Sequence, residues 1–102
     1  MDADEIRTLL GDNIFERAKK YRKRIQQSTC TVNADGVRHI SAMVQGSGGS
    51  YYYTQAWLRE NGSFVSASCS CPYNQNGEGT YCKHIGALLL DDAEKNAPAP
   101  AA

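Results

Sequence analysis

The stretch CSCPYNQNGEGTYCKH, residues 69–84, places three of the four cysteines and one of the two histidines around a glycine-rich loop. Such a concentration of sulfur and imidazole groups has three explanations: a metal site, a set of disulfides, or a cysteine nucleophile with its base. The choice among them determines how the chain closes into a domain, because each one ties the two ends of this loop together differently.

The first cysteine pair lies at the end of an expected strand. Side chains alternate along a strand, so Cys69 and Cys71 project from one side, about 7 Å apart at a rise of roughly 3.3 Å per residue. Two thiolates on one zinc ion lie only about 3.8 Å apart, given tetrahedral geometry and bonds near 2.3 Å. The strand must therefore curl at its end, and Pro72 suits that place because it ends the ladder of backbone hydrogen bonds.

The second pair, Cys82 and His84, lies at the expected start of a helix. Positions two residues apart in a helix diverge by about 200°, so both can bind one metal only if Cys82 precedes the helix. The apolar helical period begins at Ile85, which agrees with that arrangement. Residues that favour turns give the intervening loop its freedom: Asn74, Asn76, Gly77 and Gly79.

Together the two pairs form a closed Cys₃His set, the donor set typical of structural zinc. Thiolate and imidazole ligands suit Zn²⁺ better than Mg²⁺ or Ca²⁺, and a mixed-ligand iron–sulfur cluster is a weaker alternative. A nucleophile formed by Cys82 and His84 leaves Cys69 and Cys71 unexplained and lacks an orienting third group. We therefore expect one structural Zn²⁺ held by Cys69, Cys71, Cys82 and His84.

Length and charge restrict the remaining choices. A chain of 102 residues has room for one compact domain. Its 11 basic and 11 acidic residues balance, which argues against a wholly basic polyanion-binding surface but leaves room for a local basic patch. The start, MDADEIRTLL, is acidic where a signal peptide is basic, and no apolar run approaches membrane-spanning length. We expect a cytoplasmic protein with reduced thiols, which disfavours disulfides, and with neither a membrane nor a small-molecule partner.

The first part of the chain has a helical period. Residues 2–27 predict a helix in two pieces that breaks near Gly11. Each piece begins with the spacing of a capping box, Asp2 with Glu5 and Asn13 with Glu16. The apolar stripe of the second piece is expected at Ile14, Ala18, Tyr21 and Ile25.

From residue 28 onward the period is that of strands. The turn signals NADG and RENG and the loop QGSGGS separate about four short antiparallel strands. Alternation places Ile40, Ala42 and Val44 on one face of their strand, and Val65, Ala67, Cys69 and Cys71 on a single side of the last strand. Tyr51, Tyr53 and Trp57 are the core candidates of the strand between them. We expect Tyr52 and His39 to face solvent, and Cys30 to be a small buried residue.

The residues after the ligand segment predict a short C-terminal helix with Ile85, Leu88 and Leu89 as its buried stripe. The expected fold is α+β: an N-terminal helix, a small curled antiparallel meander, and a zinc site joining the last strand to the C-terminal helix. We expect a helical lead-in over residues 1–13, a zinc-binding domain over 14–93, and a flexible Pro/Ala-rich tail or linker over 94–102.

The pattern Cys-x-Cys, loop, Cys-x-His at a helix start resembles the SWIM zinc finger. That family occurs in Swi/Snf-type helicase-like ATPases, Mutator-type transposases and recombination-associated proteins. AMVQGS, CSCPY and CKHIGALLL are similar to bacterial and archaeal members with a basic, Tyr-containing helix upstream, and the similarity covers roughly residues 14–92. The resemblance implies that the four residues named above are the ligands, and that the module is non-catalytic, binds DNA or protein, and is often attached to a larger enzyme.

Two functions remain open. A basic helix face with Lys83 beside the metal site predicts contacts with nucleic-acid phosphates; its residues are Arg17, Lys20, Lys23 and Arg24. This reading makes the domain a nucleic-acid-binding accessory module, DNA first, of a larger helicase-like or DNA-processing protein. The alternative is a protein-interaction module whose basic face is merely solvated. A thiol redox switch ranks last, because closed Cys₃His sites serve structure.

Overall fold

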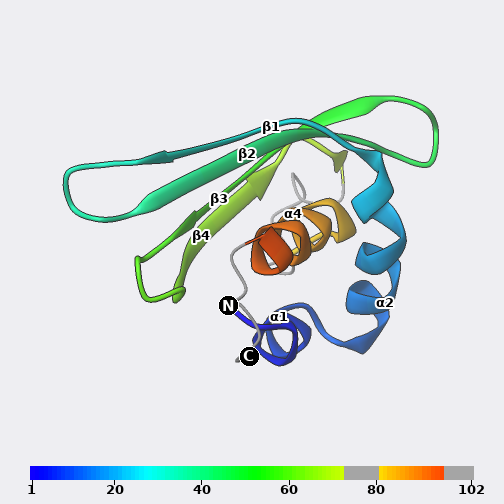
Figure 1. Cartoon of the computed structure of the whole chain (residues 1–102). Coiled ribbons are helices and arrows are strands. Elements are labelled where there is room, and N and C mark those ends of the chain that lie inside the picture. The colour runs from blue at the N-terminus through cyan, green and yellow to red at the C-terminus, as the bar shows by residue number, and fades with distance from the viewer. Residues whose placement is uncertain (73–80, 96–102) are drawn as a thin grey trace, which may run out of the picture.

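A four-stranded antiparallel sheet with helices against one of its faces makes up the fold of the computed structural model, which describes residues 1–72 and 81–95 (Figure 1). The elements, in chain order, are α1 (Ala3–Leu10), α2 (Asp12–Tyr21), the 3₁₀ turn η1 (Arg22–Arg24), β1 (Ile25–Val32), β2 (Arg38–Gln45), β3 (Tyr51–Leu58), β4 (Phe64–Cys69) and α4 (Lys83–Lys95). The strands follow one another in the order β1-β2-β3-β4. The predicted α+β class, with its meander and C-terminal helix, is confirmed.

The two N-terminal helices break where the sequence predicts. The Asp2 carboxylate accepts a 2.8 Å hydrogen bond from the Glu5 amide, and the Glu5 carboxylate accepts a 3.0 Å bond from the Asp2 amide. Gly11 separates the helices with a φ of 86°, a conformation that glycine adopts without strain. The second predicted capping box is wrong. Gly11 is itself the N-cap of α2, and no side chain caps that helix.

The second helix is shorter than predicted. It ends at Tyr21, and Ile25 is the first residue of β1, where it pairs with Val44. Ile25 is β-branched, and its pairing in the sheet outweighs the weak helical preference of the local sequence. Phe15 and Ala18 are the buried residues of α2.

The core lies between the sheet and the helices, and α4 runs through it (Figure 1). The buried apolar side chains from all layers are Ile6, Leu10, Phe15, Ala18, Ile40, Ala42, Val44, Ala56, Leu58, Ile85, Ala87, Leu88, Leu89 and Leu90. The predicted apolar face of β2 and the predicted buried stripe of α4 are therefore confirmed. Gly86 lets α4 approach the N-terminal helices, since a Cβ there would lie 2.6 Å from Leu10 Cδ1 and 2.7 Å from Ala18 Cβ.

The predicted orientation of β3 is wrong by one residue. Tyr51 and Tyr53 are 44% and 45% exposed, and Trp57 lies on the same outer face because side chains alternate. The inward side chains are instead Thr54, Ala56 and Leu58, all buried. Ala56 pairs with the inward Ile40, and a shift of one residue in a strand exchanges its two faces. Tyr52, predicted to face solvent, is half-buried on the inner side.

A bulge in β4 separates Val65, which is 42% exposed, from the side of the strand that it was predicted to share with Ala67 and Cys69. Leu58 pairs with Phe64 and Trp57 pairs with Ser66, so Val65 is an extra residue between two successive pairs. Such a bulge reverses the alternation on one side of it only. Cys69, beyond the bulge, is buried.

Two further predictions need correction at the outer strands. Cys30 is exposed, because it lies on the edge strand β1. His39 faces away from the helices, as predicted, but is half-buried. Its ring stacks on Trp57 with centroids 4.8 Å apart, and its Nε2 lies 2.9 Å from the Gln55 side-chain oxygen.

Some predictions fall outside the described residues. The turn-forming residues of the ligand loop lie in 73–80, and most of the predicted tail lies in 96–102, whereas Glu94 and Lys95 end α4. In the described part of the chain α1 packs into the same core as the later elements. None of the helices described is both long and apolar enough to cross a membrane.

Candidate metal centre

The end of β4 and the start of α4 bring the four predicted ligands together. Cys69 is the last residue of β4, and Cys71 follows before Pro72. Cys82 immediately precedes α4 and His84 lies in its first turn, which places both on the same side despite their spacing. All four side chains are buried, and their candidate ligand atoms lie within 4.8 Å of one another.

The distances within this cluster fit a tetrahedral metal. Nδ1 of His84 lies 3.7 Å from Sγ of Cys69 and 3.7 Å from Sγ of Cys82. A sulfur and a nitrogen bound to one zinc lie about 3.6 Å apart, given tetrahedral bonds near 2.3 and 2.1 Å. Nδ1 is therefore the ring nitrogen that faces the metal position.

A hydrogen bond between the Cys82 and Cys69 thiols favours ionisation of Cys69, the form that binds a cation. The Cys82 thiol donates a hydrogen bond that lowers the pKa of the Cys69 thiol, outweighing the opposing effect of burial. The same hydrogen bond raises the pKa of Cys82. Thr54 Oγ1, 3.3 Å from Cys69 Sγ, further stabilises the Cys69 thiolate. A divalent metal replaces the shared proton and allows all the thiols to ionise.

Aromatic rings hold His84 in place. The Tyr21 ring meets the imidazole edge-on with centroids 5.4 Å apart, and the Tyr52 ring lies tilted against it at 5.1 Å. Gly46 makes room for Tyr52, since a Cβ there would lie 2.6 Å from Tyr52 Cε2. Local sequence patterns do not predict these positioning residues, because the contacts join segments that are far apart in the chain. The Tyr-rich strand and the glycine-rich loop were the available signals.

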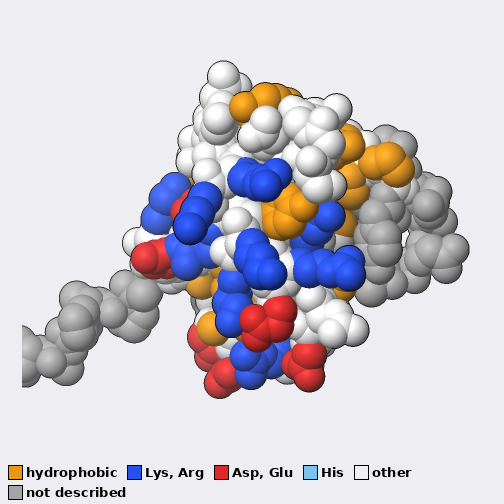
Figure 2. Space-filling model, turned by 90° about the vertical axis from the view of Figure 1, so that its right-hand side faces the viewer, with side chains coloured by type: hydrophobic (Ala, Val, Ile, Leu, Met, Phe, Trp, Pro, Cys, Tyr) orange, Lys and Arg blue, Asp and Glu red, His pale blue; other side chains and the backbone are white. Residues whose placement is uncertain are grey.

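The five predicted nucleic-acid-binding residues lie in α2, η1 and the first turn of α4: Arg17, Lys20, Lys23, Arg24 and Lys83. Figure 2 shows lysine and arginine side chains gathered on the face that the N-terminal helices form. Lys83 Nζ and Arg24 Cζ lie 4.8 Å and 4.9 Å from the centroid of the Tyr21 ring, so Lys83 adjoins the basic helix.

Ion pairs divide the cations of the described residues into two groups. Five of them pair with carboxylates: Arg7 with Asp12, Lys19 with Glu16, Arg22 with Glu94, Arg38 with Asp92 and Lys95 with Asp91. The five predicted nucleic-acid-binding residues make no ion pair within residues 1–72 and 81–95. Their positive charge is therefore not neutralised by a neighbouring described carboxylate.

The donor set identifies the metal. Three cysteines and a histidine occupy all positions of a tetrahedral ion, and thiolate with imidazole favours Zn²⁺. When bound, the ion supplies folding energy by joining the end of β4 to the start of α4. The residues present thus fit a single structural zinc ion.

Comparison with known proteins agrees with this reading. The family model of the SWIM zinc finger matches residues 52–92, a segment that runs from β3 into α4 and includes all four ligands. No curated protein and no solved structure matches the chain. The family match and the clustered Cys₃His side chains agree: residues 52–92 are similar to a SWIM zinc finger and bring together a zinc-binding set of side chains.

Proposed function

We propose that this domain is a non-catalytic module that binds nucleic acid, DNA first, and that it serves as an accessory domain of a larger helicase-like or DNA-processing protein. The observation that supports this most strongly is the basic face, defined as Arg17, Lys20, Lys23, Arg24 and Lys83. The four protein ligands complete the zinc coordination, so the metal has no open position for a substrate.

The distribution of charge supports binding to a polyanion although the formal net charge is zero. The charges of the basic face are concentrated on one side of the domain, and they make no ion pair with a described residue. A local concentration of positive charge attracts phosphates independently of the net charge. Contacts with phosphates would release counterions without first breaking protein ion pairs.

The zinc site contributes to the proposed binding surface by fixing the position of Lys83. Lys83 lies between two ligands in the sequence, and its ammonium group rests over the Tyr21 ring of α2. The metal therefore fixes the start of α4 next to the basic helix. This arrangement makes one continuous surface from two segments that are about 60 residues apart in a chain of 102 residues.

A DNA titration at two salt concentrations tests the proposal. We expect the affinity of the zinc-loaded chain for a short duplex to fall by on the order of a hundredfold between 50 and 200 mM salt, the value for about four phosphate contacts. The double variant Lys20→Glu/Lys23→Glu should bind more weakly and with a shallower salt dependence. Both side chains are exposed and neither packs in the core, so the variant should keep its fold.

Arg59→Glu is the matched control. Arg59 also makes no ion pair with a described residue, but it lies in the turn between β3 and β4, away from the basic face. We expect this variant to bind DNA nearly as the unmodified chain does. Equal weakening by both variants, or no salt-dependent binding at all, would contradict the proposal.

A second candidate function is binding of a protein partner through the outer face of the sheet. Tyr51 and Tyr53 are 44% and 45% exposed there, and Trp57 lies on the same face. Their cross-strand partners are Gln45, Met43 and His39 in β2 and Ser66 in β4, none of which is Lys, Arg, Asp or Glu. An aromatic surface without these charged residues favours a protein over a polyanion. Under this reading the domain shows negligible DNA affinity at 200 mM salt, and Lys20→Glu/Lys23→Glu changes nothing.

A further inference from the structure

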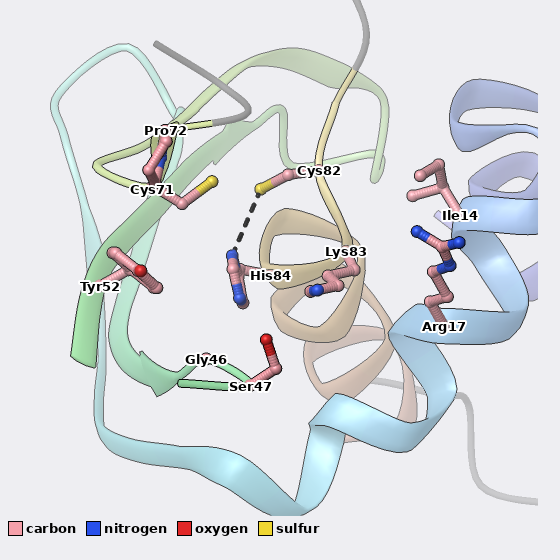
Figure 3. Close-up of a pocket in the computed structure, with 10 residues that line it drawn as sticks. All are labelled: Ile14, Arg17, Gly46, Ser47, Tyr52, Cys71, Pro72, Cys82, Lys83 and His84. Atoms are coloured by element: carbon pink, nitrogen blue, oxygen red, sulfur yellow. Dashed lines mark hydrogen bonds between the residues drawn. The ribbon is translucent and has the colours of Figure 1, made fainter. Parts of the chain in front are cut away.

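A cavity of about 170 Å³ lies beside the zinc site (Figure 3). Its walls come from α2, the loop between β2 and β3, and the first turn of α4; they include Ile14, Arg17, Ser47 and Lys83. At about 30 Å³ for each water molecule, the cavity has room for several waters or for one small polar group.

One wall of the cavity carries an unsatisfied hydrogen-bonding atom. With Nδ1 of His84 facing the thiols, Nε2 carries the ring proton in the zinc-bound form. This Nε2 is buried and has no hydrogen-bond partner among the described residues. The side chain of His84 is 96% buried, and Figure 3 shows its second nitrogen directed toward Gly46 and Ser47 at the cavity wall.

A donor in this position requires an acceptor. Metal-bound histidines almost always donate their second N–H to a carboxylate, a carbonyl or water. The Gly46 backbone lies close to this atom, since a Cβ at Gly46 would lie 3.6 Å from Nε2. The Gly46 carbonyl, however, already accepts a 3.0 Å hydrogen bond from Arg24. Within residues 1–72 and 81–95 no group accepts a hydrogen bond from Nε2, and the cavity is the space beside this atom.

The charges at the cavity select an anion. Arg17 and Lys83 line it, and neither makes an ion pair with a described residue. A zinc ion with three thiolates carries one net negative charge, so the two cations leave one positive charge in excess. A guanidinium fork, an ammonium group and an imidazole N–H together match an oxyanion with several acceptor oxygens.

We propose that this cavity binds a phosphate group, with Arg17, Lys83 and Nε2–H of His84 as the donors. The group is either a backbone phosphate of nucleic acid or a free phosphate ion; the chemistry of recognition is the same. The assignment to a backbone phosphate rests on the function proposed above, whereas the cavity itself can be tested without it.

Titration of the zinc-loaded full chain with inorganic phosphate, followed by NMR of the histidine ring nitrogens, tests the cavity directly. We expect saturable shifts of the His84 Nε2–H resonance and of the Ser47 amide. Arg17→Gln should weaken phosphate binding at least tenfold, and Lys83→Gln should weaken it as well. Arg59→Gln, in the distant β3–β4 turn, should leave phosphate affinity unchanged. Zinc content and the melting temperature should be the same in all variants, which excludes misfolding as the cause.

A parallel titration with duplex DNA separates the two sources of phosphate. If phosphate competes with DNA and Arg17→Gln weakens both, the ligand is a backbone phosphate. If phosphate binds with the expected dependence on Arg17 but DNA does not bind, the cavity is a site for a free oxyanion and the nucleic-acid function is wrong. If phosphate leaves the His84 resonance unmoved and Arg17→Gln binds DNA no more weakly than Arg59→Gln, the cavity proposal is overturned. In that last case salt-dependent DNA binding through Lys20 and Lys23 would still stand.

Discussion

Gly46 shows how a single residue without a ligand atom supports the metal centre. It lies against the Tyr52 ring that packs on His84, so its lack of a side chain permits that contact. The ligands themselves were predictable, because residue type and spacing are local properties of the sequence. The positioning role of Gly46 was not, because it depends on a contact between a loop and a neighbouring strand that only the fold creates.

Substitution Gly46→Ala should therefore destabilise the domain. The added Cβ would lie 2.6 Å from Tyr52 Cε2, so the ring must move away from His84. We expect a loss of about 1–2 kcal/mol, in the range measured for overpacked sites, seen as a lower melting temperature and weaker zinc binding. Gly48→Ala is the control, because nothing lies within 4 Å of a Cβ at Gly48. Equal melting temperatures for the two variants would show that Tyr52 does not depend on Gly46.

Acid should release the zinc. The hydrogen bond from Cys82 lowers the pKa of the Cys69 thiol in the folded, metal-free chain. A thiol with a lowered folded pKa stabilises the fold fully above its unfolded pKa, and that stabilisation is lost as the pH falls through the folded value. Bound metal extends this effect to the other thiols, since each must stay ionised. We expect a zinc-sensitive dye to report release as the pH falls from 7 toward 4. Retention of zinc at pH 4 would contradict thiolate ligation.

At the scale of elements, the periods and turn signals predicted which segments are helices and strands, but not every orientation. The alternation of side chains in β3 does not decide which face is buried. One face carries aromatic residues and the other carries small residues, and either could pack against the core. The burial of Thr54 and Ala56 is determined by how closely α4 approaches the sheet. The bulge at Val65 has no signal in the sequence of β4 itself. It arises from the pairing of Phe64 with Leu58 and of Ser66 with Trp57 on the neighbouring strand.

The ion pair between Arg38 of β2 and Asp92 of α4 is a further feature that only the fold creates. The guanidinium donates hydrogen bonds of 3.0 and 2.9 Å to the two carboxylate oxygens, and the side chains are 17% and 10% exposed. Removing one partner leaves a largely buried charge. We expect Asp92→Asn to cost about 2–3 kcal/mol in the free energy of unfolding, measured with urea. The double variant Arg38→Met/Asp92→Leu should cost less than Asp92→Asn does, and a larger cost would contradict this account of the pair.

At the scale of the whole molecule, the small hydrophobic core and the zinc ion both contribute to the free energy of folding. A domain of this size has a total stability of about 5–15 kcal/mol, whereas zinc contributes about 10–16 kcal/mol in small zinc-finger peptides. Three of the ligands, Cys69, Cys71 and Cys82, belong to the same buried cluster as residues of α1 and α2. Loss of the metal therefore affects the entire core and is not confined to the finger.

We accordingly expect a zinc chelator to unfold at least residues 63–92. Circular dichroism should show the loss of the cooperative melting transition when the chelator exceeds the protein. Added zinc should restore the transition under reducing conditions, which serves as the control for irreversible damage. A melting curve that the chelator leaves unchanged would mean that the sheet and α4 hold together without the ion.

The central claim is that one zinc ion, bound by Cys69, Cys71, Cys82 and His84, joins the end of β4 to the start of α4. X-ray absorption at the zinc edge of the freshly purified protein measures this most directly. We predict one zinc per chain, with three sulfur neighbours at about 2.3 Å and one nitrogen at about 2.0 Å. A protein without bound zinc, or a zinc ion surrounded only by oxygen and nitrogen, would contradict the account.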